Sequence, residues 1–337
     1  MAVWDHWQPL PNLTRVTTKP IEVLLCGRSL CLFRTHSGQL AALDNACPHR
    51  RLKLSVGRVV GETVECKYHG WTFDACGRGE SPGTPKMTTC TNSYDVREQH
   101  DRFWIKARGA EATFPIINPH DHFHLGTFDY VVQAPLELTL DNFTEIEHTG
   151  TVHTTFGYEL ARMNEVTVRT ESTPTTVRVV NAGPTKRLNP IIRRLLGVRK
   201  NDLFHDDWTI HFSPVHSVFD HWWSSPDGAR ESMVRWRFTI FFTPLTATTT
   251  GVIAFVHAKS KYPGPNGGLR LAKPFFRREI DREMRADVAM LGHLADYEST
   301  LEGMKLSRFD KVMGLTRERI RTIYRGERDD RISLAAG

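Results

Sequence analysis

The sequence predicts an α+β fold made of two domains. Its 337 residues suggest roughly two domains at about 150 residues each. Short β segments fill the first third of the chain, whereas the rest combines strands with one long helix near the C-terminal end. All six cysteines lie within the first 90 residues, so composition also separates the two parts. We expect an all-β domain over residues 1–109 and an α+β domain over residues 110–337.

Composition and charge are those of an ordinary globular protein. The chain is 40% hydrophobic and 24% charged, which excludes a disordered or fibrous protein. Lysine and arginine exceed aspartate and glutamate by only 44 to 38, so we expect no nucleic-acid partner. No apolar run approaches the ~18 to 20 residues of a membrane span, and the first residues form no targeting signal. We expect a cytoplasmic protein without a membrane partner, whose cysteines bind metals or pack in the core.

Strands alone are expected in the first domain. Gly27 and Gly38 supply turns between the first three apolar segments. Glycine and proline over residues 77–85 predict irregular structure there. The expected strands cover residues 21–26, 29–34, 40–43, 59–65 and 103–106.

The second domain is expected to combine a sheet with two helices. Val234, Trp236 and Phe238 alternate with polar residues, which is the period of a half-buried strand. The expected strands cover residues 165–170, 176–181, 208–213, 233–242 and 251–257. Helices are expected over residues 141–148, with Asp141 or Asn142 as the N-terminal cap, and over residues 276–298.

Two short segments of the first domain each combine one cysteine with one histidine. Cys47 and His49 form the first pair, and Cys66 and His69 form the second. Thiolates and imidazoles bind transition metals, and tetrahedral zinc accepts this set. Zinc fingers, however, pair cysteine with cysteine and histidine with histidine. One residue of each type per segment favours a [2Fe–2S] cluster with two cysteines on one iron and two histidines on the other.

The start of the second domain carries a further group of candidate ligands. Asn142, Glu145 and His148 are three residues apart, so an ideal helix would place them on one stripe. His153 lies about 140° further around such a helix than His148. Gly150 favours a break between the two histidines, which would let both imidazoles reach one ion. Two histidines and a carboxylate form the facial triad of non-haem Fe(II), which leaves coordination positions for oxygen.

Asp287 is the expected carboxylate of this triad. It lies within the apolar stripe of Ile280, Met284 and Leu291 on the expected long helix. A buried carboxylate is costly unless it is paired or bound to a metal. Asp281 lies beside the stripe and is expected in solvent. The alternative for Asp287 is an ion pair with an arginine across the core.

One competing row of histidines stands between the two domains. His120, His122 and His124 alternate, so a strand would place all three imidazoles on one face. Pro119 and Asp121 favour an exposed loop instead. We therefore do not expect these histidines to bind the iron.

Both groups of candidate ligands resemble motifs of the Rieske non-haem iron oxygenases. The pattern C-x-H…C-x₂-H-G-W, which ends at Trp71, is similar to the Rieske cluster motif. The pattern D-N-x-x-E-x-x-H-x₄-H over residues 141–153 is similar to the catalytic motif of the α-subunits, as are A-D-V-A-M-L at 286–291 and T-P-L at 243–245. The resemblance implies a Rieske domain followed by a helix-grip domain, in which an antiparallel sheet packs against the long C-terminal helix.

The resemblance also implies partners and a route for electrons. The family assembles head-to-tail, so we expect a homotrimer. A separate NAD(P)H-dependent reductase or ferredoxin would reduce the cluster. Electrons would then pass between subunits through a carboxylate hydrogen-bonded to one histidine of each centre, here Glu145 between His69 and His148. Asn142 and Glu145 are thus the expected catalytic residues, although the family commonly has aspartate where this chain has the longer Glu145.

The expected function is O₂-dependent hydroxylation of a small organic substrate by monooxygenation or oxidative demethylation. The alternative reactions are cis-dihydroxylation of an aromatic ring and cleavage of a quaternary amine, the latter because glutamate at the bridging position resembles that branch. A non-catalytic electron-transfer or zinc-binding protein is the alternative of a different class. The strand aromatics are expected in the core rather than in a substrate pocket: Trp208, Phe212, Trp222, Trp223 and Phe241.

Overall fold

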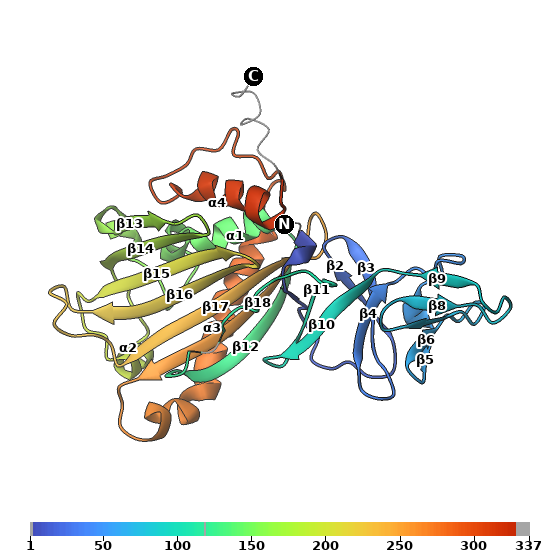
Figure 1. Ribbon diagram of the computed structural model, residues 1–337. Coiled ribbons are helices and arrows are strands. Elements are labelled where there is room, and N and C mark those ends of the chain that lie inside the picture. The colour runs from blue at the N-terminus through green and yellow to red at the C-terminus, as the bar shows by residue number, and fades with distance from the viewer. Residues whose placement is uncertain (1–2, 118, 328–337) are drawn as a thin grey trace. The chain divides into compact units, whose positions relative to one another are not determined.

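The chain forms two compact units. Figure 1 presents the computed structural model, which describes residues 3–117 and 119–327. The first unit comprises Met1–Phe114 together with Thr243–Gly251, and the second comprises Pro115–Phe242 together with Val252–Gly337. Sheets dominate both units and the described α-helices lie in the second, so the expected α+β class is confirmed. The expected boundary after residue 109 stays a prediction.

A six-stranded sheet forms the larger part of the first unit, in the order β1-β11-β10-β4-β3-β2. Strand β3, which lies between β4 and the edge strand β2, has buried side chains on both faces, because successive side chains of a strand point to opposite sides. Leu30 and Leu32 join one core cluster, whereas Cys31 and Phe33 join another. The strand bounds are β1 (Gln8–Pro9), β2 (Ile21–Leu25), β3 (Arg28–Arg34), β4 (Leu40–Asp44), β10 (Ser93–Gln99) and β11 (Arg102–Ala107).

A five-stranded sheet in the order β5-β6-β7-β8-β9 completes the β structure of this unit. Val64 and Phe73 of this sheet pack with Cys31 and Phe33 of β3. The strand expected over residues 59–65 is instead two strands joined by a turn. The bounds are β5 (Arg58–Val60), β6 (Thr63–Glu65), β7 (Thr72–Asp74), β8 (Arg78–Glu80) and β9 (Thr88–Cys90).

The prediction of irregular structure over residues 77–85 is wrong for β8. Gly79 of β8 pairs with Phe73 of β7, and a Cβ on Gly79 would lie 2.4 Å from the Phe73 ring. The missing side chain therefore permits a close strand contact, although a glycine-rich sequence usually signals a loop.

A segment distant in sequence completes the first unit. The Cys26 N–H donates to the Pro244 carbonyl, and the Gly27 N–H donates to the Leu245 carbonyl, both at 2.8 Å. Within the same unit, a Cβ on Gly251 would lie 2.7 Å from Cγ of Pro11. Residues 243–251 thus satisfy backbone groups of the β2–β3 turn and pack against the N-terminal segment.

The second unit contains a seven-stranded sheet in the order β12-β18-β17-β16-β15-β14-β13. The expected strands are present; four of them are longer than expected, β13 is displaced by two residues, and β12 and β16 were not expected. β16 lacks a simple alternation because it carries His216, Asp220 and His221 among its apolar residues. The bounds are β12 (Phe123–Val132), β13 (Thr167–Ser172), β14 (Thr176–Pro184), β15 (Leu203–Phe212), β16 (Val215–Ser224), β17 (Val234–Pro244) and β18 (Thr250–Ser260).

Helix α3 lies across one face of this sheet, where it packs against β12 and α1 (Figure 1). A helix is present where one was expected over residues 276–298, but it begins and ends seven residues earlier. Helix α3 runs from Leu269 to Leu291, and Gly292 is its C-terminal cap. In the two described ranges, no helix has the length and apolar character needed to cross a membrane. The helix bounds are α1 (Leu136–Thr144), α2 (Pro190–Leu196), α3 (Leu269–Leu291) and α4 (Met313–Arg319).

The helix expected over residues 141–148 is wrong at both ends. Helix α1 begins at Leu136 and ends at Thr144, and a 3₁₀ turn, η3 (Glu147–Gly150), follows. Asp141 is therefore not an N-terminal cap. It is buried within α1, and its carboxylate accepts hydrogen bonds from the guanidinium of Arg317. This partner, far away in the sequence, explains why a local capping rule misplaced the helix.

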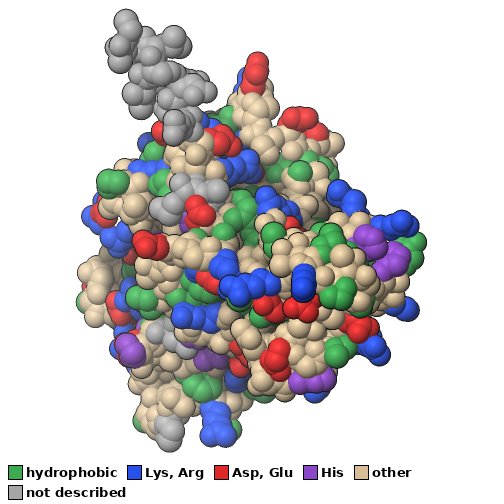
Figure 2. Space-filling view, turned by 45° about the vertical axis from the view of Figure 1, so that its right-hand side comes forward, with side chains coloured by type: hydrophobic (Ala, Val, Ile, Leu, Met, Phe, Trp, Pro, Cys, Tyr) green, Lys and Arg blue, Asp and Glu red, His purple; other side chains and the backbone are tan. Residues whose placement is uncertain are grey.

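Charges of both signs are mixed on the face drawn in Figure 2, where Lys and Arg side chains lie among Asp and Glu. Several opposite charges form exposed ion pairs, for example Arg34 with Glu98 at 2.7 Å and Lys53 with Glu22 at 2.8 Å. Exposed pairs of this kind contribute little to the free energy of unfolding.

Candidate functional site

Two hydrogen-bonded loops of the first unit carry the cysteine–histidine pairs. In the loop after β4, the Cys47 N–H donates to the Leu52 carbonyl at 2.9 Å. In the loop between β6 and β7, the Cys66 N–H donates to the Trp71 carbonyl at 2.7 Å, and the Gly70 N–H donates to the Cys66 carbonyl at 3.0 Å. Gly70 has φ +71°, a conformation that favours glycine and closes the second loop.

The four side chains on these loops separate into an inner pair and an outer pair. Cys47 and Cys66 are each 2% exposed, and burial raises the pKa of the Cys47 thiol. His49 and His69 are exposed, with their ring centroids 4.5 Å apart. Trp71 stacks on His49 at 4.8 Å. Two buried sulfurs beside two exposed imidazoles fit the unequal ends of a Rieske [2Fe–2S] cluster.

In the second unit, a change of backbone direction places the next two histidines. Helix α1 ends at Thr144, and Glu145 is extended, with φ −94° and ψ 156°. His148 lies in η3 and His153 follows it, with the two rings 4.9 Å apart and nearly perpendicular. The expected break between the histidines is present, but the single helical stripe expected for Asn142, Glu145 and His148 is wrong because the helix ends before Glu145.

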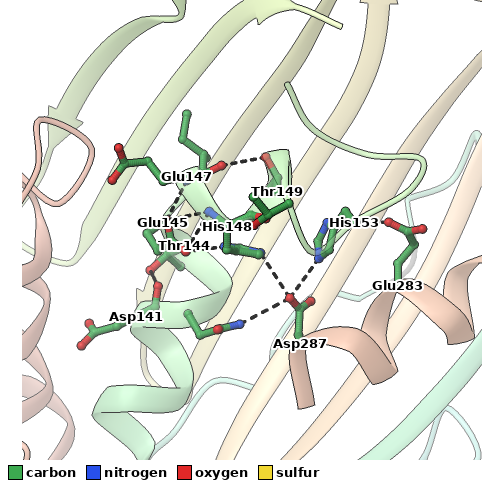
Figure 3. A network of polar contacts seen from close by, with 12 residues as sticks. Asp141, Thr144, Glu145, Glu147, His148, Thr149, His153, Glu283 and Asp287 are labelled. Atoms are coloured by element: carbon green, nitrogen blue, oxygen red, sulfur yellow. Dashed lines mark hydrogen bonds and ion pairs between the residues drawn. The ribbon is translucent and has the colours of Figure 1, made fainter. Parts of the chain in front are cut away.

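The two imidazoles converge on one carboxylate oxygen of α3 (Figure 3). Oδ1 of Asp287 lies 2.9 Å from Nε2 of His153 and 3.2 Å from Nε2 of His148. Asn142 Nδ2 donates to the same oxygen at 3.4 Å. The ligand atoms of His148, His153 and Asp287 all lie within 4.8 Å of one another, and this set of two nitrogens and one oxygen fits a facial triad.

The electrostatics of this cluster favour a cation. Asp287 is buried, and burial acts to raise the pKa of its carboxyl group, but the two neighbouring histidines outweigh this and lower it to about 2. Burial likewise opposes charge on His148, yet Asp287 and Glu145 together raise the pKa of its imidazole to about 9. The expected alternative, an arginine partner for Asp287, is wrong for the described contacts, in which histidines and Asn142 face the carboxylate.

Each of the two imidazoles has a second carboxylate near its Nδ1 atom (Figure 3). Nδ1 of His148 hydrogen-bonds Oε1 of Glu145, whose other oxygen accepts the Glu147 N–H at 2.7 Å. Nδ1 of His153 lies 3.7 Å from Oε2 of Glu283 on α3. Such partners orient metal-bound histidines and fix their tautomer.

Glu283 is a site residue that the sequence reasoning missed. It is buried, and its carboxylate accepts the backbone N–H of Thr154 at 3.0 Å, that of Thr155 at 3.3 Å and the Thr154 hydroxyl at 2.5 Å. A signal was present, because Glu283 precedes Asp287 by one helical turn and so lies on the same apolar stripe.

Lys186 was also missed, and no local pattern singles it out. Its ammonium group, at the end of a long side chain after β14, donates to the carbonyls of Thr149, Gly150 and His153. Burial lowers the pKa of Lys186. This contact ties together the backbone of the loop that carries both histidines.

The candidate iron ligands line a pocket with aromatic walls. The pocket contains about 640 Å³ of space free of protein atoms, its opening included, within the range of small-molecule sites. Among the described residues, no lysine or arginine lines it. Its apolar walls come from α1, the loop after η3 and the central strands: Phe143, Phe156, Phe204, Phe219, Phe238 and Ile240.

Other residues weighed from the sequence lie outside this pocket. The strand aromatics are buried in the sheet as expected, apart from the partly exposed Trp222, and none of them lines the pocket. The expected loop of alternating histidines ends at His122, whose Nδ1 lies 2.7 Å from Asp121 Oδ1, and His124 belongs to β12. Asp281 is not simply solvated, because it accepts the Tyr130 hydroxyl at 2.6 Å.

Family models match both parts of the chain. Residues 6–95 match the Rieske [2Fe–2S] domain. Residues 132–302, about half of the chain, match the vanillate O-demethylase oxygenase C-terminal domain. The first match contains both cysteine–histidine loops, and the second contains His148, His153 and Asp287.

Individual relatives agree with these matches. The chain is 29% identical over 271 residues to a toluene-4-sulfonate monooxygenase system iron–sulfur subunit of Comamonas testosteroni, covering 74% of this chain and 75% of the relative. It is 52% identical over 159 residues to a 4β-methylsterol monooxygenase of Methylococcus capsulatus, covering 43% of each. Its fold matches dicamba monooxygenase bound to 3,6-dichlorosalicylic acid with a TM-score of 0.73 at 18% identity over 99% of both chains. The chain therefore belongs to the Rieske non-haem iron oxygenases, oxidoreductases that use a Rieske [2Fe–2S] cluster and a catalytic Fe(II).

Proposed function

We propose that this chain is the oxygenase component of a system that hydroxylates a small organic substrate with O₂, by monooxygenation or oxidative demethylation. The observation that carries the proposal is the convergence of His148, His153 and Asp287 in a pocket with apolar walls. Electrons would come from NAD(P)H through a separate reductase or ferredoxin. The family model named for vanillate O-demethylase and the relatives named as monooxygenases support this choice over ring dihydroxylation.

The residues present would hold both metal centres. Cys47, Cys66, His49 and His69 would hold the [2Fe–2S] cluster. His148, His153 and Asp287 would hold Fe(II). When bound, the two centres would supply one-electron transfer and O₂ activation.

Neighbouring side chains hold the candidate iron ligands in their orientations. Asn142 donates to the Asp287 oxygen that faces both imidazoles, which holds that carboxylate in place. Glu145 and Glu283 accept from backbone amides and face the outer nitrogens of His148 and His153, so each ring presents Nε2 towards Asp287. The phenylalanine walls would favour an apolar substrate over water next to the ligands.

Glu145 is proposed to have a second role in electron transfer. Its side chain is 22% exposed although it contacts His148, so the side chain is only partly covered by its own unit. In a head-to-tail homotrimer, Glu145 would link His148 of one subunit to His69 of the next. The side chain of Glu145 is one methylene longer than aspartate, and its Oε2 accepts a hydrogen bond from the nearby Glu147 N–H.

Turnover with defined electron donors tests the proposed function. The purified protein is supplied with NADH, O₂ and a surrogate reductase, and a panel of methyl ethers, methylamines and hydrocarbons is screened for oxygenated products by mass spectrometry. NADH-dependent incorporation of one atom from ¹⁸O₂, or loss of a methyl group, is the expected result. Colourless protein that contains zinc and no acid-labile sulfide would contradict the proposal.

A further inference from the structure

Two charged side chains from distant segments contact the loop that carries the candidate iron ligand His153. Lys186 follows β14 in the chain, and Glu283 lies on α3. The ring of His153 faces Asp287 and Glu283 in Figure 3. Its backbone contacts Lys186, so the position of His153 depends on residues outside its own loop.

Lys186 and Glu283 hold the same peptide group, which joins His153 to Thr154. Nζ of Lys186 donates to the His153 carbonyl at 2.5 Å. Oε2 of Glu283 accepts the Thr154 N–H at 3.0 Å. A trans peptide group is planar, and its C=O and N–H point in opposite directions. Contacts at both ends therefore prevent this group from turning, which fixes the backbone that carries the His153 ring.

The two charges match the dipole of this peptide group. The positive ammonium group of Lys186 lies at the carbonyl end, and the negative carboxylate of Glu283 lies at the N–H end. Burial lowers the pKa of Lys186, whereas the charge of Glu283 acts to raise it, so the two groups influence each other across the peptide. Hydrogen bonds to ionised groups are stronger than those between neutral groups, so the pair holds the peptide firmly.

Lys186 also holds the segment that directly follows the other candidate histidine ligand. Its ammonium group donates to the carbonyls of Thr149 at 2.5 Å and Gly150 at 3.5 Å, and Thr149 is the neighbour of His148. An ammonium group can point its three donors at three convergent oxygens, whereas the planar guanidinium of arginine presents its donors in a fixed fork. This set of carbonyls therefore suits a lysine.

Both side chains start from backbone that is itself held in place. Thr185, which precedes Lys186, forms a β-bridge with Tyr158. The Thr185 hydroxyl accepts the indole N–H of Trp223 at 2.9 Å. Glu283 is buried on α3, where the helix backbone fixes its starting point. The loop is thus held from the sheet on one side and from the helix on the other.

We propose that Lys186 is a positioning residue of the candidate iron site, and that it acts together with Glu283 by fixing the peptide group of His153. Through this peptide the pair holds Nε2 of His153 at 2.9 Å from Oδ1 of Asp287. The inference rests on the proposed function, because it takes Fe(II) as the ion that these ligands bind.

Iron affinity tests the role of Lys186 without any turnover. Lys186→Met keeps most of the side-chain length and removes the ammonium group, so the affinity for Fe(II) in a chelator competition should fall about tenfold or more. Lys273→Met is the matched control, because Lys273 also donates to a backbone carbonyl, that of His124 on β12, at 3.3 Å. Unchanged Fe(II) affinity in Lys186→Met, or equal losses in both variants, would overturn the inference.

A spectroscopic readout separates positioning from a general loss of stability. Nitric oxide is added to the ferrous protein, and the EPR spectrum of the adduct reports the symmetry of the ligands around the iron. We expect a changed spectrum in Lys186→Met. Lys186→Arg keeps the charge without the three convergent donors, so its Fe(II) affinity should lie between those of Lys186→Met and the unmodified protein. A lower melting temperature of Lys186→Met with unchanged spectrum and affinity would limit Lys186 to a structural role and contradict the inference.

A double variant tests whether the two side chains act as one unit. Once Lys186→Met has released the carbonyl end of the peptide, Glu283 alone no longer fixes its orientation, so Glu283→Gln has less left to remove. We expect the double variant to lose less Fe(II) affinity than the product of the two single losses. Losses that multiply would show that the two side chains act independently, against the shared hold on the peptide.

Failure of this inference and failure of the proposed function give different results. The expected pattern of Fe(II) affinities in a protein that forms no oxygenated product would support the positioning role and contradict the oxygenase proposal. Normal turnover by Lys186→Met with unchanged Fe(II) affinity would support the oxygenase proposal and overturn the positioning role.

Discussion

The two groups of candidate metal ligands are held in different ways. The cysteine–histidine set stands on two short loops whose turns are closed by backbone hydrogen bonds, and its histidines are exposed. The set of His148, His153 and Asp287 comes from a loop and a distant helix, and buried side chains hold it in place. Exposure suits a centre that exchanges electrons with partners, whereas burial suits a centre whose chemistry must exclude water.

The comparison predicts that each centre can be removed without the other. The backbone turns of the first unit do not depend on the side chains around Asp287, and α3 does not belong to the first unit.

Asp287→Ala should remove the mononuclear iron and leave the cluster intact. The variant loses the carboxylate that contacts both imidazoles. Turnover should therefore fall by more than the roughly 10- to 100-fold loss that is typical for residues hydrogen-bonded to metal ligands. Iron per chain and the visible and EPR spectra of the cluster check both halves of the prediction. Asp296→Ala, at an exposed position after α3, is the control. Full retention of iron in Asp287→Ala would show that Asp287 is not a ligand.

Cys66→Ser should produce the converse result. Cys66 is buried beside Cys47, and replacement of its sulfur should abolish the visible absorption of the cluster while the mononuclear iron stays bound. Acid-labile sulfide analysis and iron counting measure the two centres separately. Cys90→Ser, at an exposed cysteine, should change neither. Loss of both centres in Cys66→Ser would break the proposed independence.

Glu283→Gln should weaken iron binding about 10- to 100-fold without changing the cluster spectrum. The neutral amide removes the charge behind His153, and its NH₂ group would face a backbone N–H of Thr154 or Thr155. Competition with an iron chelator measures the change in affinity. Glu279→Gln, one turn earlier on α3, serves as the control, because it removes only the ion pair of Glu279 with the exposed Arg282. Unchanged affinity in Glu283→Gln would limit that residue to a structural role.

His216 should make the second unit sensitive to mild acid. It is buried against Phe241, and Nδ1 donates to the Pro214 carbonyl at 2.9 Å. Burial lowers the pKa of His216 from 6.5 to about 3. Between these values the unfolded chain binds the extra proton, so the stabilisation present above pH 6.5 is lost as the pH falls.

The expected loss between pH 7 and pH 5 is about 2 kcal/mol of unfolding free energy. His216→Phe should flatten this dependence, whereas His293→Phe, at an exposed histidine, should leave it unchanged. Denaturant unfolding at several pH values, followed by tryptophan fluorescence, measures the slope. An identical slope in His216→Phe and the unmodified protein would rule out His216 as its source.

The contrast between ligands on local loops and ligands from distant segments also explains how much of the site could be predicted from the sequence. The cysteine–histidine loops were recognisable because their spacing is local and their chemistry is unusual. Asp287 was found by a different argument, since a carboxylate within an apolar stripe requires a partner. Both arguments use information carried within one or two segments of the chain.

The residues that were missed depend on contacts between distant segments. Lys186 meets three carbonyls of the histidine loop, and Arg317 meets Asp141 inside α1, but neither pair is visible as a pattern. Glu283 could have been found by the argument used for Asp287.

The segment at residues 243–251 has a consequence for biosynthesis. A ribosome releases the chain from the N-terminus, but the carbonyls that accept the Cys26 and Gly27 amides lie at residues 244 and 245. The first unit therefore cannot complete its native hydrogen bonding until residue 245 has been translated, long after residue 114. A cluster-assembly system that acts during translation would meet an incomplete first unit, and a fragment ending at Phe114 would remain in that unfinished state.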